Sequence, residues 1–175
     1  MKTFLLFIII LASNSFLVAQ ENFQTFHSAG FKVKCGCQFY VNNLFITMAK
    51  QNGINNILFA YICGENKESS ELGVANNINI TDESASYSRI SPSNYNYFEK
   101  KSLEAYAKNL SNAGFTYNYI SYKGVTALEY NFDQLGLPTK ALFFLKNKKT
   151  YLIQSGSRTN LTSKFNLLKN SFEFL

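Results

Sequence analysis

The chain has few of the residues from which enzyme active sites are built. Its 175 residues include one histidine (His27), three cysteines, two prolines and no tryptophan. A nucleophile elbow, a zinc-binding His-Glu-x-x-His helix and a glycine-rich phosphate loop are all missing. Acidic pairs such as Asp82-Glu83 are isolated, so neither a glycosidase pair nor a calcium loop is indicated. We therefore expect a non-enzymatic protein without a cofactor or a metal.

Long apolar runs are also scarce, and the longest lies at the N-terminus. Residues 4–11 are uniformly apolar, Lys2 is the only charge among the first twenty residues, and Val18-Ala19-Gln20 offers a small residue for cleavage. This order is typical of a secretory signal peptide, and the run is too short to cross about 30 Å of hydrocarbon. We predict that residues 1–19 are a signal peptide and that the mature chain is secreted or periplasmic, with no membrane span.

Positive charge is in excess, with a formal net charge of +6. The lysines are nevertheless spread along the chain, and the densest groups are Lys100-Lys101 and Lys146/Lys148/Lys149. Charge that is dispersed in this way does not form the concentrated patch that a nucleic acid requires, so we expect no nucleic-acid partner. Residues with AT-rich codons are abundant, which together with the leader indicates a bacterial source.

The three cysteines, Cys35, Cys37 and Cys63, indicate a disulfide, because exported proteins use cysteine mainly in this way. A bridge between Cys35 and Cys37 would close too small a ring. Cys63 ends an apolar run of strand length, and paired strands place Cα atoms about 4.5–5.5 Å apart. The strand at 31–37 is a plausible neighbour of the strand at 57–63, and Cys35 lies deeper in its pattern than Cys37. We therefore predict a Cys35–Cys63 disulfide, with Cys37–Cys63 as the alternative. A soft-metal site of three thiolates and an intermolecular or redox role for the third thiol are the other interpretations.

Alternation and helical periodicity predict most of the secondary structure. The continuous apolar run at 57–63 indicates a central strand that is covered on both faces. A polar, solvated loop is expected at 64–73. We predict strands at 31–37, 57–63, 76–81, 115–122, 125–132, 140–146 and 150–155, and helices at 44–51 (capped by Asn43), from Ser91-Pro92 to Gly114, and at 161–172.

The last of these helices has the clearest periodicity in the chain. Leu161, Phe165, Leu168 and Phe172 recur at spacings of four, three and four, so we expect them to be buried against a sheet. After the leader, roughly 155 residues remain, which is enough for one domain with its own core. The order of elements predicts a single α+β domain over residues 20–175, with an antiparallel β-sheet flanked by helices.

Several of these segments share an arrangement that is found in a known group of proteins. They are the strand at 31–34, the long helix ending at Gly114, the strand at 127–132 after Lys123-Gly124, the hairpin at 141–154 and the closing segment 165–172. In this arrangement the chain resembles the PsbP/Mog1-like superfamily of small secreted or envelope proteins. The resemblance implies an α/β/α sandwich and a role as an assembly factor or binding module. It carries over no functional residue, because no functional motif matches.

These sequence features leave two functional classes. The first, which we favour, is a non-enzymatic binding or assembly module of the bacterial envelope, whose envelope-protein partner would bind an exposed apolar patch. The second is a carrier or reader of a small apolar or sugar ligand in a tyrosine-rich cleft. The candidate ligand contacts are Tyr87, Tyr95, Tyr97, Tyr117, Tyr119 and Tyr122. Tyrosines of this kind also serve as half-buried packing.

Overall fold

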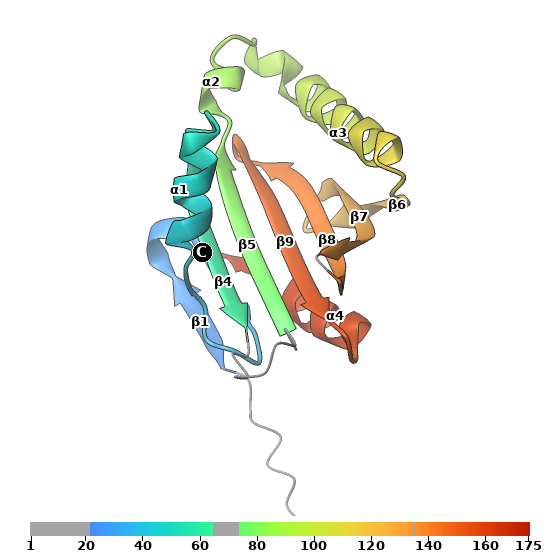
Figure 1. The fold of residues 1–175 in the computed structure, drawn as a ribbon. Coiled ribbons are helices and arrows are strands. Elements are labelled where there is room, and N and C mark those ends of the chain that lie inside the picture. The colour runs from blue at the N-terminus through green and yellow to red at the C-terminus, as the bar shows by residue number, and fades with distance from the viewer. Residues whose placement is uncertain (1–21, 65–73, 135) are drawn as a thin grey trace, which may run out of the picture.

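The computed structural model describes residues 22–64, 74–134 and 136–175, which form a mixed α+β fold (Figure 1). The predicted signal peptide at 1–19 and most of the predicted loop at 64–73 lie outside the described residues. The helices are α1 (Asn43–Gln51), α2 (Ser84–Tyr87), α3 (Tyr95–Asn112) and α4 (Leu161–Ser171), with short 3-10 turns at His27–Ala29 and Pro92–Asn94. The strands are β1 (Phe23–Phe26), β2 (Phe31–Lys34), β3 (Tyr40–Val41), β4 (Ile57–Gly64), β5 (Val74–Asp82), β6 (Tyr117–Tyr122), β7 (Val125–Gln134), β8 (Leu137–Lys146), β9 (Lys149–Ser157) and β10 (Glu173–Phe174).

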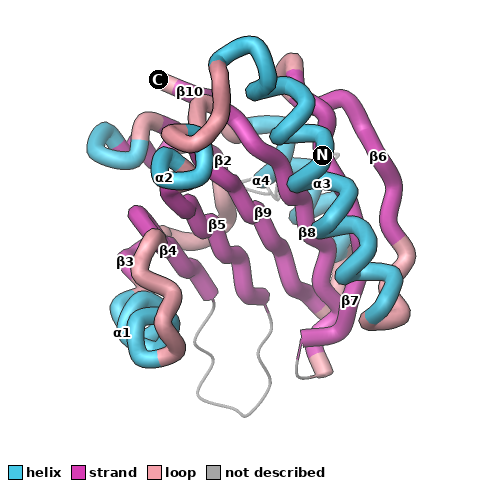
Figure 2. The backbone as a smooth tube through the Cα atoms, turned by 90° about the horizontal axis from the view of Figure 1, so that it is seen from above, coloured by secondary structure: helices cyan, strands magenta, loops and turns pink. Residues whose placement is uncertain are grey.

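These strands form two antiparallel sheets. The main sheet has seven strands in the order β3-β4-β5-β9-β8-β7-β6, and the small sheet has the order β1-β2-β10. Seen from above, the main sheet is a row of strands with α1 at its β3–β4 end and α3 over β8 and β7 (Figure 2). The predicted antiparallel sheet flanked by helices is therefore present, together with a second, smaller sheet.

Two tight turns set the register of the main sheet. Lys123 and Gly124 join β6 to β7, and Asn147 and Lys148 join β8 to β9; all four residues have positive φ angles between 48° and 82°. Two consecutive residues of this conformation make the type I′ turn, whose twist matches that of a right-handed hairpin. Both hairpins were expected from the sequence.

The larger hydrophobic core lies between one face of the main sheet and a layer formed by α4 and the small sheet. Phe165 and Leu168 of α4, and Phe172 directly after it, are fully buried, as the periodicity predicts. Leu161 in the first helical turn is half-buried. Phe172 stacks on Phe31 of β2 with ring centroids 4.9 Å apart. The C-terminal helix thus joins the two sheets.

The opposite face of the main sheet is covered by α3 where β7 and β8 run beneath it. Tyr106 stacks on Phe143 with ring centroids 3.8 Å apart, and its hydroxyl lies 2.8 Å from that of Tyr130. The buried apolar residues that join helix and sheet here are Leu103, Ala107, Leu110, Leu128, Tyr130, Ala141 and Leu145. The long helix therefore buries its apolar side against the β7–β8 part of this face.

Two predictions about the N-terminal strands are wrong. The strand expected at 31–37 ends at Lys34 and belongs to the small sheet, not beside the strand at 57–63. That second strand, β4, was expected to be central but is next to the edge, with the two-residue β3 outside it. A continuous apolar run predicts burial on both faces, whereas Leu58 of β4 is exposed at this edge.

Candidate functional site

Apolar side chains gather at the β3 edge of the main sheet. Twelve large apolar residues are exposed among those the structure describes, and seven of them lie between positions 40 and 58. Because β3 pairs with β4 and α1 packs on β4, these seven belong to one edge of the molecule. We call this group the β3–α1 surface; it consists of Tyr40, Val41, Leu44, Phe45, Met48, Ile54 and Leu58.

The helix at the centre of this surface turns apolar side chains away from the core. Asn42, rather than the predicted Asn43, caps α1, because its side chain accepts a hydrogen bond of 3.0 Å from the backbone N–H of Phe45. Ala49 is the buried residue of the helix. Leu44 and Met48, four positions apart and therefore on one side of the helix, are 72% and 52% exposed.

The segment that carries this surface is basic, but the acidic Asp82 lies beside it, where its backbone N–H donates to the Asn56 carbonyl at 2.7 Å. Residues 22–64 contain no aspartate or glutamate, whereas Lys50 lies exposed near the end of α1. Lys32 on β2 is paired with Glu173 of β10 at 2.9 Å, so its charge is compensated. The charge of residues 22–64 is therefore positive, with Asp82 at the border of the surface.

A cleft lies between α3 and the β6–β7 hairpin, on the other half of the molecule. Its volume is about 730 Å³, within the range of small-molecule sites. Leu103, Val125 and Leu145 give it an apolar part. Its polar lining consists of Asn96, Glu99, Lys100, Glu104, Tyr119 and Thr126. The cleft thus combines apolar and charged groups, as a ligand with both kinds of chemistry requires.

The six tyrosines proposed as ligand contacts do not meet in one place. Tyr119, half exposed, is the one of the six that lines the cleft. Tyr97 is exposed on α3, and Tyr95 packs edge-on against Tyr87. Tyr117 packs between α3 and the sheet. Alternation along β6 explains part of this dispersal, because Tyr122 points to the face opposite Tyr117 and Tyr119.

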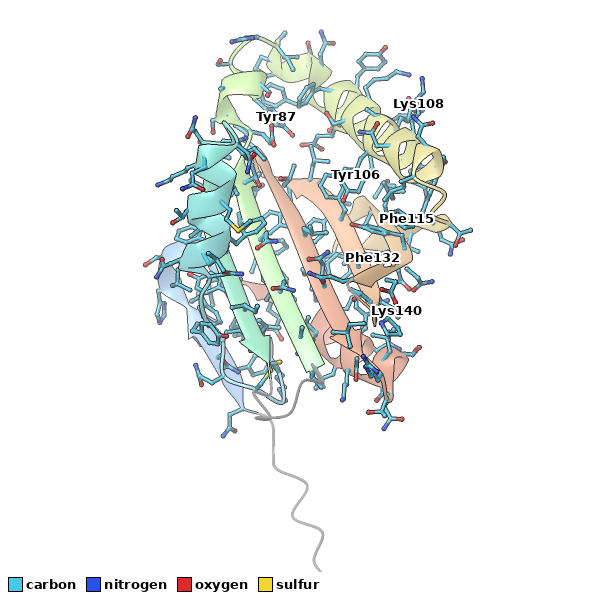
Figure 3. The ribbon with its side chains drawn as sticks, in the orientation of Figure 1. Tyr87, Tyr106, Lys108, Phe115, Phe132 and Lys140 are labelled. Carbon is cyan, nitrogen blue, oxygen red and sulfur yellow. A yellow bond between two sulfur atoms is a disulfide. The ribbon has the colours of Figure 1, made fainter. Side chains whose placement is uncertain are left out.

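Two of these tyrosines are packing residues with internal hydrogen bonds. Tyr87 is buried and donates a 2.6 Å hydrogen bond to Glu99. Burial first, and the Glu99 carboxylate second, raise the pKa of Tyr87. Tyr122 is also buried; its hydroxyl donates to the Lys169 carbonyl at 2.7 Å, and burial raises its pKa. Figure 3 shows Tyr87 at the junction of α2 and α3, apart from Tyr106 farther along α3.

The three cysteines converge, but not in the predicted pairing. Cys63 is joined to Cys37, whereas Cys35 was favoured from the sequence. That prediction assumed that the strand of Cys35 lies beside the strand of Cys63. Because β2 is in the other sheet and ends at Lys34, both Cys35 and Cys37 lie in the segment after it, and the position of a cysteine within a strand does not decide the pairing.

Family models and curated proteins give no relative of this chain. No protein-family model matches the sequence, and no curated protein matches it either. None of the helices in the described part of the chain combines the length and the apolar character that a membrane crossing requires. The functional interpretation therefore depends on the β3–α1 surface, the cleft and the cysteine cluster.

The β3–α1 surface is the candidate that the sequence reasoning missed. The helix at 44–51 was predicted, but no role was assigned to its apolar residues. One signal was present, because the apolar residues of this helix cover more of its circumference than a single sheet contact can bury. They are Leu44, Phe45, Ile46, Met48 and Ala49.

Proposed function

We propose that this protein is an exported, non-enzymatic binding module of the bacterial envelope that binds a partner protein through the β3–α1 surface. The observation that supports this function is the exposure of Leu44, Met48 and their apolar neighbours at one edge. Large exposed apolar patches are rare on monomers and are typical of interaction sites. The Cys37–Cys63 pair supports export, because disulfides persist in oxidising compartments.

The same proposal includes the type of fold. A PsbP/Mog1-like α/β/α sandwich places one antiparallel sheet between helices. In this chain α4 lies against one face of the main sheet and α3 against the other, which supports that assignment. Fold analogy alone does not select a partner, whereas the chemistry of the surface limits which partners it can bind.

The chemistry of the surface defines the partner's side of the interface. Leu44, Phe45 and Met48 offer flexible and aromatic apolar contacts, which are enriched at the centres of interfaces. Lys50 lies at the end of the same helix, and acidic residues are absent from positions 22–64. The partner would therefore present an apolar helix or loop, with an acidic side chain opposite Lys50.

Photo-crosslinking in cells of the source organism tests this function. A benzoylphenylalanine replaces Leu44 in one version of the full precursor and Lys108, an exposed residue of α3, in another. We expect a discrete adduct with one envelope protein from position 44 and none from position 108. Adding Met48→Glu to the version labelled at position 44 should abolish the adduct, because a charge would be buried in the interface.

Other adducts have defined meanings. An adduct of twice the chain mass would show that the partner is a second copy of this chain. The same adduct from positions 44 and 108, or none from either, would contradict binding through the β3–α1 surface.

The cleft under α3 supports a second candidate function, a carrier or reader of a small ligand. Its volume of about 730 Å³ and its mixed lining suit a ligand with an apolar body and polar groups, such as a sugar derivative. Tyr119 would then provide the aromatic contact. If crosslinking identifies no protein partner, this function becomes the preferred one.

A further inference from the structure

The three cysteine sulfurs lie together where the segment after β2 meets β4. The Cys35 sulfur lies 3.0 Å from that of Cys63 and 3.4 Å from that of Cys37. All three Sγ atoms lie within 4.8 Å of one another. Cys35 and Cys63 are buried, and Cys37 is half-buried. Three sulfurs from two separate segments of the chain are thus directed at one point.

Asn76 of β5 completes the surroundings of these sulfurs. It stands opposite Cys63 in the strand register and is 5% exposed. Its side-chain Nδ2 lies 3.1 Å from the Cys35 sulfur and 3.6 Å from each of the other two. An amide N–H that donates to sulfur stabilises the negative charge of a thiolate ligand, as outer-shell groups of metal sites do.

The cavity beside the cluster has a basic lining residue, and unsatisfied polar atoms lie on the neighbouring strands. Lys164 of α4 lines the same cavity of about 80 Å³ as Cys35, Cys37 and Asn76. Oδ1 of Asn76 and Oγ of its register neighbour Ser155 are buried and make no hydrogen bond within the described part of the chain. Buried polar atoms normally have partners, so this site is not fully satisfied with the disulfide formed.

We propose that Cys35, Cys37 and Cys63, once the Cys37–Cys63 disulfide is reduced, form a trigonal site for one Cu(I) ion. Thiolates select soft ions such as Cu(I). Zinc takes four ligands, and among the described residues the group that could hold a metal contains these three cysteines alone. A three-sulfur set without a fourth ligand therefore favours Cu(I) over Zn(II).

Site formation has two balanced steps. First, an external dithiol or phosphine supplies two electrons, so that the Cys37–Cys63 bond breaks, each sulfur gains a proton, and the reductant is oxidised. Second, Cu(I) bonds to the three sulfurs and displaces their three protons to solvent, without a change in its oxidation state. The site carries two negative charges, and Lys164, whose ammonium group donates to Ser157 at 3.0 Å, is the basic residue that lines its cavity. This inference does not depend on the proposed binding function.

Titration of the whole mature protein tests the proposal. The protein is reduced by a phosphine without oxygen, and Cu(I) is supplied from a complex with bathocuproine disulfonate. We expect one Cu(I) per chain, three sulfur neighbours by X-ray absorption, and protection of all three thiols from iodoacetamide. The oxidised protein, whose disulfide is intact, should leave Cu(I) with the chelator.

Two variants separate the ligands from their surroundings. Cys37→Ser alters the half-buried position, so it is the cysteine change that disturbs the core least; it should weaken Cu(I) binding at least about tenfold and leave two sulfur neighbours. Asn76→Ala should keep three sulfur neighbours but also weaken binding about tenfold. Circular dichroism checks that both variants are folded.

Three results would overturn the proposal. The first is reduced wild-type protein that takes no Cu(I) from the chelator. The second is a wild-type protein in which Cu(I) has only two sulfur neighbours, together with a Cys37→Ser variant that binds Cu(I) as tightly as wild type. The third is Zn(II) that binds at one per chain, protects the thiols and is not displaced by Cu(I).

Discussion

Helices α4 and α1 share a helical spacing of apolar residues but have opposite surroundings. Both are short, and both have apolar residues at spacings of three and four. In α4, Phe165 and Leu168 are fully buried beneath the main sheet. In α1, Leu44 and Met48, which are four positions apart, are exposed. The difference lies in the neighbours, because α4 lies between two sheets whereas α1 lies at the edge of one.

This comparison shows what an apolar stripe does and does not indicate. A period of 3.6 predicts a helix with one apolar side, and it does not say whether that side meets the protein's own core or a partner. The apolar side of α4 is used for folding. We infer that the apolar side of α1 is used for binding, and three stability measurements can break or sharpen this contrast.

The largest effect is expected at the centre of the buried helix. Phe165→Ala should lower the free energy of unfolding by about 3–5 kcal/mol, because it removes a fully buried ring and leaves a cavity. Phe45→Ala on α1 is the matched control and should cost under about 1 kcal/mol. Urea unfolding followed by circular dichroism measures both. Equal losses in the two variants would remove the contrast between the helices.

A smaller effect, with a defined pH dependence, is expected at Tyr122. Tyr122→Phe removes the hydrogen bond to the Lys169 carbonyl of α4 and should cost about 1 kcal/mol at neutral pH. Tyr40→Phe on β3 is the matched control; its ring is 57% exposed, and the change should stay within about 0.5 kcal/mol.

The pH dependence follows from the raised pKa of Tyr122. An unfolded tyrosine ionises near pH 10, whereas burial keeps Tyr122 neutral to higher pH. The contribution of its burial is therefore complete below pH 10 and declines above it, as the unfolded chain loses a proton that the folded protein retains. Urea unfolding between pH 8 and 12 should show a shallower decline for Tyr122→Phe than for wild type. An identical decline would show that Tyr122 does not titrate on unfolding.

The smallest effect is expected on the β3–α1 surface. Leu44→Asp places a charge on an exposed side of α1 and should change the free energy of unfolding by at most about 0.5 kcal/mol. The same substitution should prevent crosslinking from a label placed at position 48. A decrease in the free energy of unfolding of more than about 2 kcal/mol would mean that Leu44 stabilises the fold. The β3–α1 surface would then no longer be a candidate binding site.

Most elements of the fold were predictable, because their signals are local. The turn at Lys123-Gly124, the stripe of α4 and the end of α3 before Gly114 each depend on a few neighbouring residues. The sheet to which residues 31–34 belong was not predictable. Alternation of apolar and polar residues shows which face of a strand is buried, but it does not show which strand pairs with it. The short β3 and β10 have too few residues for any pattern.

The candidate sites were predictable only in part. The sequence placed Cys63 in a disulfide, and the structure shows that its partner is Cys37. It placed Tyr119 among possible ligand contacts, and the structure locates that residue at the cleft under α3, while Tyr87 and Tyr122 are packing residues. Side chains from separate elements meet through tertiary packing, which a single stretch of sequence does not encode.

The sequence by itself determined the α+β class, the order of most helices and strands, and which side of each is apolar. These features follow from local backbone preferences and from the periods of the helix and the strand. The tertiary structure alone decided that β2 joins a separate sheet, that three sulfurs and Asn76 converge, and that α1 stays uncovered. The physical reason is that burial and proximity depend on which elements pack against one another, and many packings satisfy the same local pattern.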